Sequence, residues 1–167
     1  MTSIKNEFLE MLTKYQGILY KVGLVYFHDE ANRKDNFQEI VYQLWKSYPK
    51  VKNKNSLGSW IYAVAINTSI SKLHKESRIE YKEKMPDPSD TENISDNMEK
   101  NEEVDLLLRA IHNLGDIDKT IIMLYLEEKS YGEIARITGM SQSNVGVRIN
   151  RTKKILNKNL KYMDHGK

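Results

Sequence analysis

The sequence predicts an all-α protein made of two small helical domains that are joined by an acidic linker. Apolar residues recur at steps of three and four along most of the 167-residue chain, which is the spacing of helices with one buried face. No useful length alternates with the period of two that marks a strand, and only 8 residues are glycine. A polar segment with two prolines separates the helices into two groups.

The N-terminal group is expected to form a bundle of three helices. Two apolar stripes mark the first two helices: Phe8, Leu12, Tyr15, Leu19 and Val22, then Phe37, Ile40, Val41, Leu44, Trp45 and Tyr48. Pro49 should end the second helix, because proline lacks a backbone N–H. Ser56 can cap a third helix, whose residues 60–66 are apolar on more than one side, so this helix should lie centrally.

The stretch 79–103 differs in composition from its surroundings. It holds nine acids, three lysines, and two prolines among small polar residues, so few of its side chains can form a core. Beyond it, Gly115 separates a helix at 117–126 from another apolar stripe, Val104, Leu107, Leu108, Ile111 and Leu114. We therefore expect a first domain at 1–78, a flexible linker at 79–103, a second domain at 104–160 and a basic tail at 161–167.

The net charge of +3 conceals a strong polarisation along the chain. Residues 46–78 carry seven basic side chains and one acid, and residues 141–167 also carry seven basic side chains and one acid. Because a polyanion responds to local charge, both segments are candidates for contact with nucleic acid. Charge runs are usually only solvated faces, but both of these coincide with sequence motifs.

Residues 130–156, SYGEIARITGMSQSNVGVRINRTKKIL, have the layout of a helix-turn-helix. Ser130 and Glu133 are spaced as a capping box, in which each side chain accepts a hydrogen bond from the other residue's backbone N–H. Gly139 stands where the tight turn favours a residue without Cβ, and Ser141 can cap the second helix. Val145 and Ile149 should then point inward. A plain helical hairpin with a basic face is the alternative, but the agreement of cap, turn, core spacing and basic tail favours DNA binding.

Burial of Val145 and Ile149 leaves the other side of the second helix free to face a major groove, which admits one α-helix. We expect Arg148 and Arg151 to contact phosphates and, as exposed charges, to contribute little to stability. The residues expected on this DNA-binding face are Gln142, Ser143, Asn144, Gly146, Val147, Arg148, Asn150, Arg151 and Lys154.

The C-terminal motif resembles region four of RNA polymerase sigma factors of the extracytoplasmic-function type, and the N-terminal half resembles their region two. Residues 35–45, DNFQEIVYQLW, are similar to the family's acidic-Gln-Glu…Trp helix. Residues 56–67, SLGSWIYAVAIN, are similar to its Trp-Leu-Tyr…Ala…Asn helix, which basic residues follow. The matches occur in the family's order and cover about two thirds of the chain. Gly146 and Val147 depart from the polar or basic residues that the family often has there.

The resemblance implies a sigma factor that directs core RNA polymerase to specific promoters. Region four would bind the −35 element, and region two would dock on the polymerase and recognise and melt the −10 element. The residues implied in docking, on the β′ clamp helices, are Asp35, Gln38, Glu39, Tyr42 and Trp45. Those implied at the −10 element are Val51, Lys52, Asn53, Lys54, Asn55, Asn67, Lys72, Lys75 and Arg78. The implied partners are core polymerase, including its β flap, promoter DNA and, as a further candidate, an anti-sigma factor.

Three of these implied roles have structural alternatives. Trp45 continues an apolar stripe, which favours the core over the docking interface, so Gln38 and Glu39 are the better docking candidates. The segment 51–55 can be only a loop. Asn67 can be a buried amide that caps a neighbouring helix, although a buried amide needs several hydrogen-bond partners, which favours the functional role.

We expect no catalysis, metal site, cofactor or small-molecule substrate. The chain has no cysteine, and His28, His74, His112 and His165 lack metal-ligand spacing. The N-terminus has no signal-peptide core and no stretch nears the roughly 20 apolar residues of a membrane span, which favours a cytoplasmic protein. A one-component regulator or response regulator with a similar helix-turn-helix ranks second, because residues 1–78 lack the pattern of a ligand or phosphoacceptor domain. The other alternative is a stand-alone helix-turn-helix regulator whose N-terminal bundle is a protein-interaction module.

Overall fold

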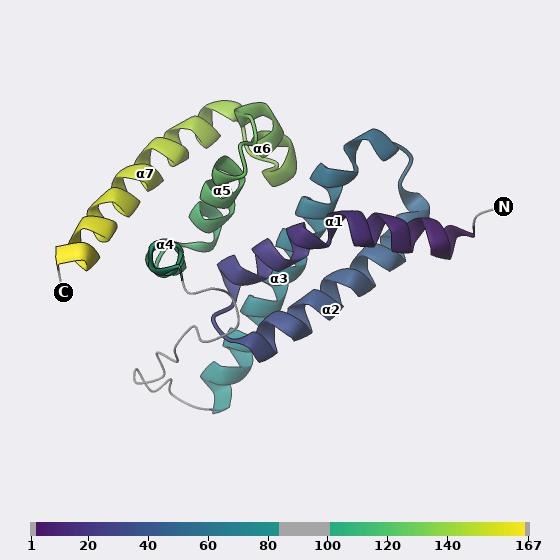
Figure 1. Cartoon of the computed structure of the whole chain (residues 1–167), viewed down its shortest axis with the longest axis horizontal. Coiled ribbons are helices and arrows are strands. Elements are labelled where there is room, and N and C mark those ends of the chain that lie inside the picture. The colour runs from purple at the N-terminus through teal and green to yellow at the C-terminus, as the bar shows by residue number, and fades with distance from the viewer. Residues whose placement is uncertain (1–2, 84–100, 166–167) are drawn as a thin grey trace. The chain divides into compact units, whose positions relative to one another are not determined.

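The computed structural model describes residues 3–83 and 101–165, with side chains in residues 3–78 and 101–162. Every regular element within these ranges is a helix, which confirms the predicted all-α class (Figure 1). The chain divides into two compact units, Met1–Asn93 (unit 1) and Ile94–Lys167 (unit 2). Each unit has its own hydrophobic core.

Unit 1 is a bundle of three helices, α1 (Ile4–Tyr26), α2 (Glu30–Ser47) and α3 (Leu57–Glu83), each of which packs against the other two. All three contribute side chains that are at most 1% exposed: Leu19, Val22, Ile40, Leu44, Ile61 and Ala65. The helix α2 ends just before Pro49, as predicted, and two single 3₁₀ turns, η1 (Tyr48–Lys50) and η2 (Lys54–Ser56), lead into α3. The buried members of the predicted stripes are thus Phe8, Leu19, Val22, Ile40, Leu44 and Tyr48, whereas Trp45 remains partly exposed.

A buried hydrogen bond joins α2 to α3 inside this bundle. The Asn36 side-chain amide donates to the Ser69 hydroxyl at 2.9 Å, and that hydroxyl donates to the Ala65 carbonyl at 2.7 Å. Both polar side chains are fully buried, so the bond fixes the register of one helix against the other. Sequence analysis did not single out this pair, because two polar residues 33 positions apart leave no periodic signal.

Unit 2 packs four helices, α4 (Glu102–His112), α5 (Asp116–Leu126), α6 (Tyr131–Thr138) and α7 (Gln142–His165). The long helix α7 contacts the other three. The most deeply buried side chains of this unit include Ile111, Ile121, Leu124, Ile134, Val145 and Ile149. Unit 2 is therefore organised around α7.

Two helices run past the boundaries expected from the sequence. The helix α3 continues through residues 79–83 of the expected linker, and α7 continues through residues 161–165 of the expected tail. Both stretches lack glycine and proline until Pro86 and Gly166, so nothing local stops either helix earlier. Residues 84–100, the rest of the expected linker up to α4, lie outside the described residues.

Lys119 on α5 is a buried cation, with 9% of its surface exposed. Burial lowers the pKa of its amino group by disfavouring the charged form, and the nearby Asp116 carboxylate partly opposes this shift. At neutral pH the buried charge therefore lowers the free energy of unfolding. The destabilisation decreases as pH rises from the lowered folded-state pKa toward the ordinary value of 10.5. In that range the folded protein has released the Lys119 proton while the unfolded chain still holds it, so the free energy of unfolding rises with pH.

We predict that Lys119→Met raises the melting temperature at neutral pH, because it keeps the length of the side chain and removes the buried charge. The gain should diminish as pH rises through the lowered folded-state pKa of Lys119 toward the ordinary value of 10.5. Calorimetry of both chains across this range measures the effect. Arg109→Met on the exposed surface of α4 is the control and should give no such pH-dependent gain. A gain independent of pH would contradict the assigned cause.

Candidate nucleic-acid interface

The first helix of the helix-turn-helix, α6, begins at a serine cap. The Ser130 hydroxyl oxygen accepts a hydrogen bond from the Glu133 backbone N–H at 3.1 Å, which is the first of the two bonds of the predicted capping box. The Glu133 carboxylate forms an ion pair with Lys129 at 3.9 Å. The start of α6 is therefore fixed by local residues, as the sequence predicts.

The turn between α6 and α7 has the predicted glycine in a left-handed conformation. Gly139 has a φ of 76°, and its N–H donates to the Ala135 carbonyl at 2.9 Å. The Ser141 hydroxyl oxygen accepts from the Asn144 backbone N–H at 3.2 Å and so caps α7. The direction in which α7 leaves the turn follows from these two residues.

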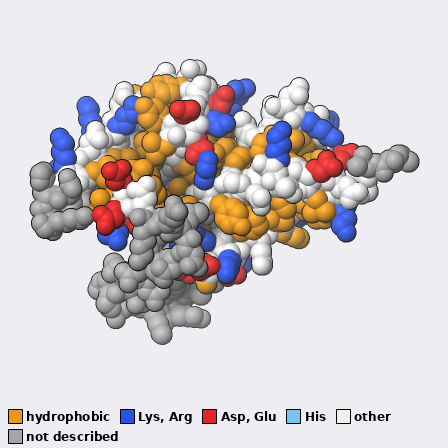
Figure 2. Space-filling view, viewed as in Figure 1, with side chains coloured by type: hydrophobic (Ala, Val, Ile, Leu, Met, Phe, Trp, Pro, Cys, Tyr) orange, Lys and Arg blue, Asp and Glu red, His pale blue; other side chains and the backbone are white. Residues whose placement is uncertain are grey.

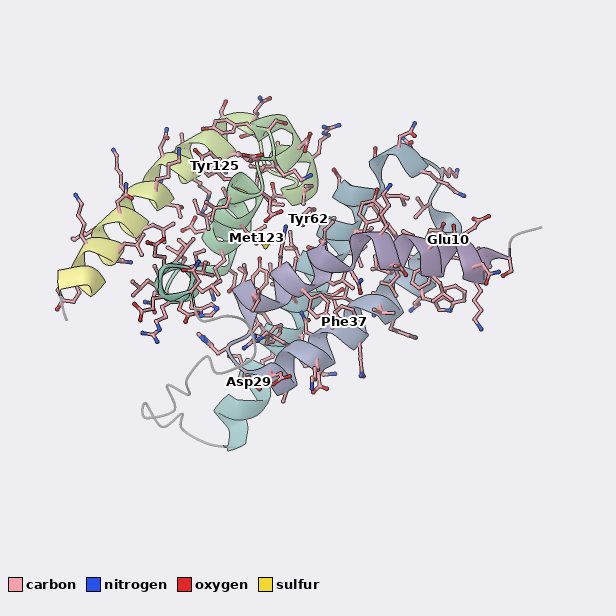
Figure 3. The ribbon with its side chains drawn as sticks, viewed as in Figure 1. Glu10, Asp29, Phe37, Tyr62, Met123 and Tyr125 are labelled. Atoms are coloured by element: carbon pink, nitrogen blue, oxygen red, sulfur yellow. The ribbon has the colours of Figure 1, made fainter. Side chains whose placement is uncertain are left out.

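One side of α7 is buried and the other is open to solvent. Val145, Ile149 and Thr152 are fully buried against the rest of unit 2. The predicted DNA-binding residues that are exposed are Gln142, Ser143, Asn144, Val147, Asn150, Arg151 and Lys154. Lys and Arg side chains project along the outer edge of α7 (Figures 2 and 3).

Two predicted DNA-binding residues are not freely exposed. Arg148 donates to the Asp118 carboxylate of α5 at 3.1 Å, and its side chain is only 29% exposed. Gly146 is half-buried, because the Tyr131 ring lies against it. The expectation that Arg148 contributes little to stability assumed that its charge is exposed. That assumption is wrong, because the Arg148 side chain is half-buried and forms an ion pair between α7 and α5.

The residues expected to dock on the polymerase share the exposed face of α2. Asp35, Gln38 and Glu39 are exposed, and Tyr42 is 56% exposed. The Trp45 ring contacts the Phe8 ring edge-on, with centroids 5.0 Å apart, yet 42% of Trp45 remains exposed. The alternative that places Trp45 in the buried core is thus wrong, although its ring packs against the buried Phe8.

The loop expected at the −10 element is largely open to solvent. Lys52, Asn53, Lys54 and Asn55 are exposed, while Val51 is half-buried. The Asn53 side chain accepts from the Asn55 backbone N–H at 3.0 Å and so shapes the turn. Lys54 lies 3.2 Å from the Glu7 carboxylate, and the hydrogen bond and charge of Glu7 raise the pKa of the Lys54 amino group. The loop therefore presents polar and cationic side chains.

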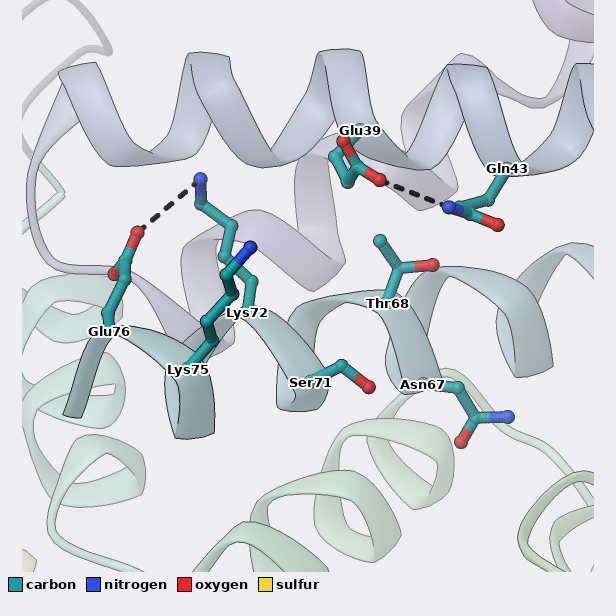
Figure 4. A pocket seen from close by; sticks show the side chains of 8 residues that line it. All are labelled: Glu39, Gln43, Asn67, Thr68, Ser71, Lys72, Lys75 and Glu76. Atoms are coloured by element: carbon teal, nitrogen blue, oxygen red, sulfur yellow. Dashed lines mark hydrogen bonds and ion pairs between the residues drawn. The ribbon is translucent and has the colours of Figure 1, made fainter. Parts of the chain in front are cut away.

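A polar groove lies between α2 and α3 (Figure 4). Three predicted −10 residues line it: Asn67 and Lys75, which are exposed, and Lys72, which pairs with Glu76 at 3.4 Å. The alternative of a buried Asn67 is therefore wrong. Arg78, the remaining residue of the −10 set on α3, is exposed.

The same groove contains residues that sequence analysis did not single out, namely Gln43, Thr68, Ser71 and Glu76. Glu39, predicted for docking, also lines it and accepts a hydrogen bond from Gln43 at 3.1 Å. The polar residues of α3 recur at steps of three and four, a pattern that marks one helix face and could have revealed Thr68 and Ser71. The α2 face and the −10 set thus meet in one place.

Within the described residues, no helix is long and apolar enough to cross a membrane. In the same parts of the chain, no group of three or more His, Cys, Asp and Glu side chains is placed to hold a metal ion.

Comparison with known families gives matches in both units. Residues 11–79 match the family Sigma-70 region 2, and residues 105–156 match the family Sigma-70, region 4. The chain belongs to the sigma-70 family. Its helix-turn-helix lies within the region 4 match, and α2 with most of α3 lies within the region 2 match.

This sigma factor is similar to RNA polymerase sigma factor SigV of Bacillus subtilis (strain 168). The two are 27% identical over 146 residues, which cover 87% of this chain and 86% of SigV. Two solved structures share its fold. One is the sigma factor RpoE in complex with the anti-sigma factor NepR from Bartonella quintana, with a TM-score of 0.76 and 17% identity over 93% of this chain and 97% of that chain. The other is CnrH in complex with the cytosolic domain of CnrY, with a TM-score of 0.65 and 15% identity over 95% of this chain and 90% of that chain.

The sigma factor directs core RNA polymerase to promoters for the initiation of transcription, and it binds DNA through the helix-turn-helix of region 4. Region 2 followed by region 4 is the layout of the extracytoplasmic-function type, as the sequence indicates. A stand-alone regulator is not favoured, since the N-terminal bundle itself matches region 2.

We predict that Arg148→Ala destabilises unit 2 whereas Arg151→Ala does not. Losing the half-buried pair with Asp118 should lower the free energy of unfolding by up to about 1 kcal/mol, and Arg151 is exposed on the same helix. Denaturant unfolding of the full chain, followed by circular dichroism, measures the difference. Equal stability of the two variants would mean that the ion pair makes no net contribution.

Proposed function

We propose that the two units divide promoter recognition between them. The exposed face of α7 would enter the major groove of the −35 element, and α3 with the loop 51–55 would contact the −10 element. The exposed face of α2 would dock on the β′ clamp helices of core polymerase. The observation that carries the proposal is that the residues implied for each contact are mostly exposed. Those for the −35 element lie on one face of α7, those for docking lie on one face of α2, and those for the −10 element lie on α3 and the loop 51–55.

The case for α7 rests on its exposed polar and cationic side chains. Gln142, Ser143 and Asn144 stand in its first turn, where a recognition helix contacts base edges. Arg151 and Lys154 follow on the same exposed side and are suited to phosphates. The first turn would therefore supply specificity, and the next turns would supply charge.

The case for α3 rests on the groove beside α2. Asn67 offers an amide that can both donate and accept hydrogen bonds, and Lys72 and Lys75 offer positive charge. Sequence-specific recognition of an unpaired strand uses both kinds of group, one for base edges and one for the backbone. The exposed loop at Lys52–Asn55 carries the same two kinds of side chain.

The docking face combines charge with exposed aromatic surface. Tyr42 and Trp45 supply exposed rings, and Gln38 and Glu39 supply polar groups beside them. Aromatic anchors surrounded by polar groups are typical of protein interfaces. The β flap of the polymerase is the proposed second contact, made by unit 2.

The proposal has three further parts, which concern the role of the chain, its location and a further partner. The chain would select where transcription begins, while the polymerase performs the chemistry. It would work in the cytoplasm, where the polymerase is. An anti-sigma factor is a proposed partner, since the structurally similar RpoE was solved in complex with the anti-sigma factor NepR.

We predict that Arg151→Ala weakens binding of the polymerase–sigma complex to a cognate promoter and reduces the slope of log affinity against log salt by about 1, the value for one lost phosphate contact. Filter binding or fluorescence anisotropy between low and moderate salt measures the slope. Arg109→Ala removes one positive charge from the exposed surface of α4 and is the matched control. Equal slopes for wild type and Arg151→Ala would exclude a phosphate contact at Arg151.

We predict that the double substitution Gln38→Ala with Glu39→Lys lowers affinity for core polymerase without lowering the melting temperature, because both side chains are exposed on α2. The matched control is Gln16→Ala with Glu10→Lys, which makes the same changes at exposed positions of α1. Pull-down of core polymerase and a binding titration compare the two. Normal binding by the α2 variant would move the docking site elsewhere.

A further inference from the structure

The centre of the exposed face of α7 is apolar. Val147 stands about 200° around the helix from buried Val145, at roughly 100° per residue, so it points directly away from the core. Its side chain is 55% exposed. Its neighbours one turn away on the same face are Ser143, Asn150 and Arg151, all of them polar and exposed.

The residue before Val147 is Gly146, which has no side chain. A Cβ added at Gly146 would stand 3.3 Å from Cε2 of the Tyr131 ring and 3.6 Å from Cδ2. The glycine thus lets the ring of Tyr131, the first residue of α6, lie against the backbone of α7. Because Tyr131 is itself 37% exposed, an aromatic edge takes the place of a residue-146 side chain beside Val147.

Val147 contributes little to the stability of unit 2. It does not contribute to the core, and a β-branched residue is less favourable than alanine at an exposed helix position. Single exposed apolar residues are common on protein surfaces, but this one stands where a recognition helix meets the bases. Arg151 and Lys154 on the same exposed side supply the positive charge that holds such a face against DNA.

The major groove offers one apolar group on its base edges, the C5-methyl group of thymine. We propose that Val147, with the Tyr131 ring beside it, contacts a thymine methyl in the −35 element and thereby favours an A·T pair at that position. The proposal rests on the proposed placement of α7 in that groove. It also gives a reason for the glycine and valine at 146 and 147, since a polar pair there would present hydrogen-bonding groups to the same position.

The test uses holoenzyme assembled from the full chain and core RNA polymerase, with a promoter that this holoenzyme selects from a library of genomic fragments. Each thymine of the −35 element, on either strand, is replaced in turn by 2′-deoxyuridine, which lacks only the methyl group. For wild type, we expect one position at which this replacement lowers affinity about three- to fivefold, the loss expected from one buried methyl group. Val147→Ala should largely abolish the effect at that position, and Tyr131→Phe should retain it, because the ring and not the hydroxyl supplies the apolar surface.

Arg151→Ala separates this inference from the proposed function on which it rests. It should weaken binding to all the DNAs and keep the deoxyuridine effect. If neither Arg151→Ala nor scrambling of the −35 element changes binding, the placement of α7 is wrong and this inference falls with it. If both change binding but no thymine is sensitive, if the effect is the same in Val147→Ala, or if the selected element has no A·T pair, the methyl contact alone is overturned.

Discussion

The burial of one side of α7 is the constraint on which the DNA-binding unit depends. Val145 and Ile149 are 0% exposed, and full burial of an aliphatic side chain stabilises a fold by about 1.5–3 kcal/mol. Because a helix turns by about 100° per residue, this burial sets the rotation of α7 and hence which residues can meet DNA. A helix rotated to present other residues would expose both side chains. The recognition face is therefore a consequence of the core.

The same relation holds in the N-terminal bundle. Burial of Ile40 and Leu44 against the other helices turns the opposite side of α2, with Gln38 and Tyr42, toward solvent. The buried bond between Asn36 and Ser69 then holds α2 and α3 in one register. That register brings Glu39 and Gln43 of α2 into one groove with Asn67 and the lysines of α3, so the proposed docking face and the proposed −10 face share an edge.

Acidic residues of this chain compete with DNA for some of its basic side chains. Three cations of the implied DNA-binding sets already pair with acids of this chain: Lys54 with Glu7, Lys72 with Glu76 and Arg148 with Asp118. A half-buried pair such as that of Arg148 contributes up to about 1 kcal/mol, and a phosphate that pairs with the same cation offsets the loss of the acid. These acids lower the attraction for any polyanion and leave more of the discrimination to shape and base contacts.

Sequence alone determined the helical class, the order of the two sigma regions, the serine caps of α6 and α7 and the turn glycine at 139. These features are local, because caps, turn conformations and helical stripes depend on residues within a few positions of one another. Only the tertiary structure decided which residues of different helices meet. Arg148 pairs with Asp118, 30 positions away, and the Tyr131 ring lies against Gly146. Residues of α2 and α3 together line the groove beside Asn67. Such partners lie on different helices, whose rotation and register are set by the packing of a whole unit and by no segment of the chain on its own.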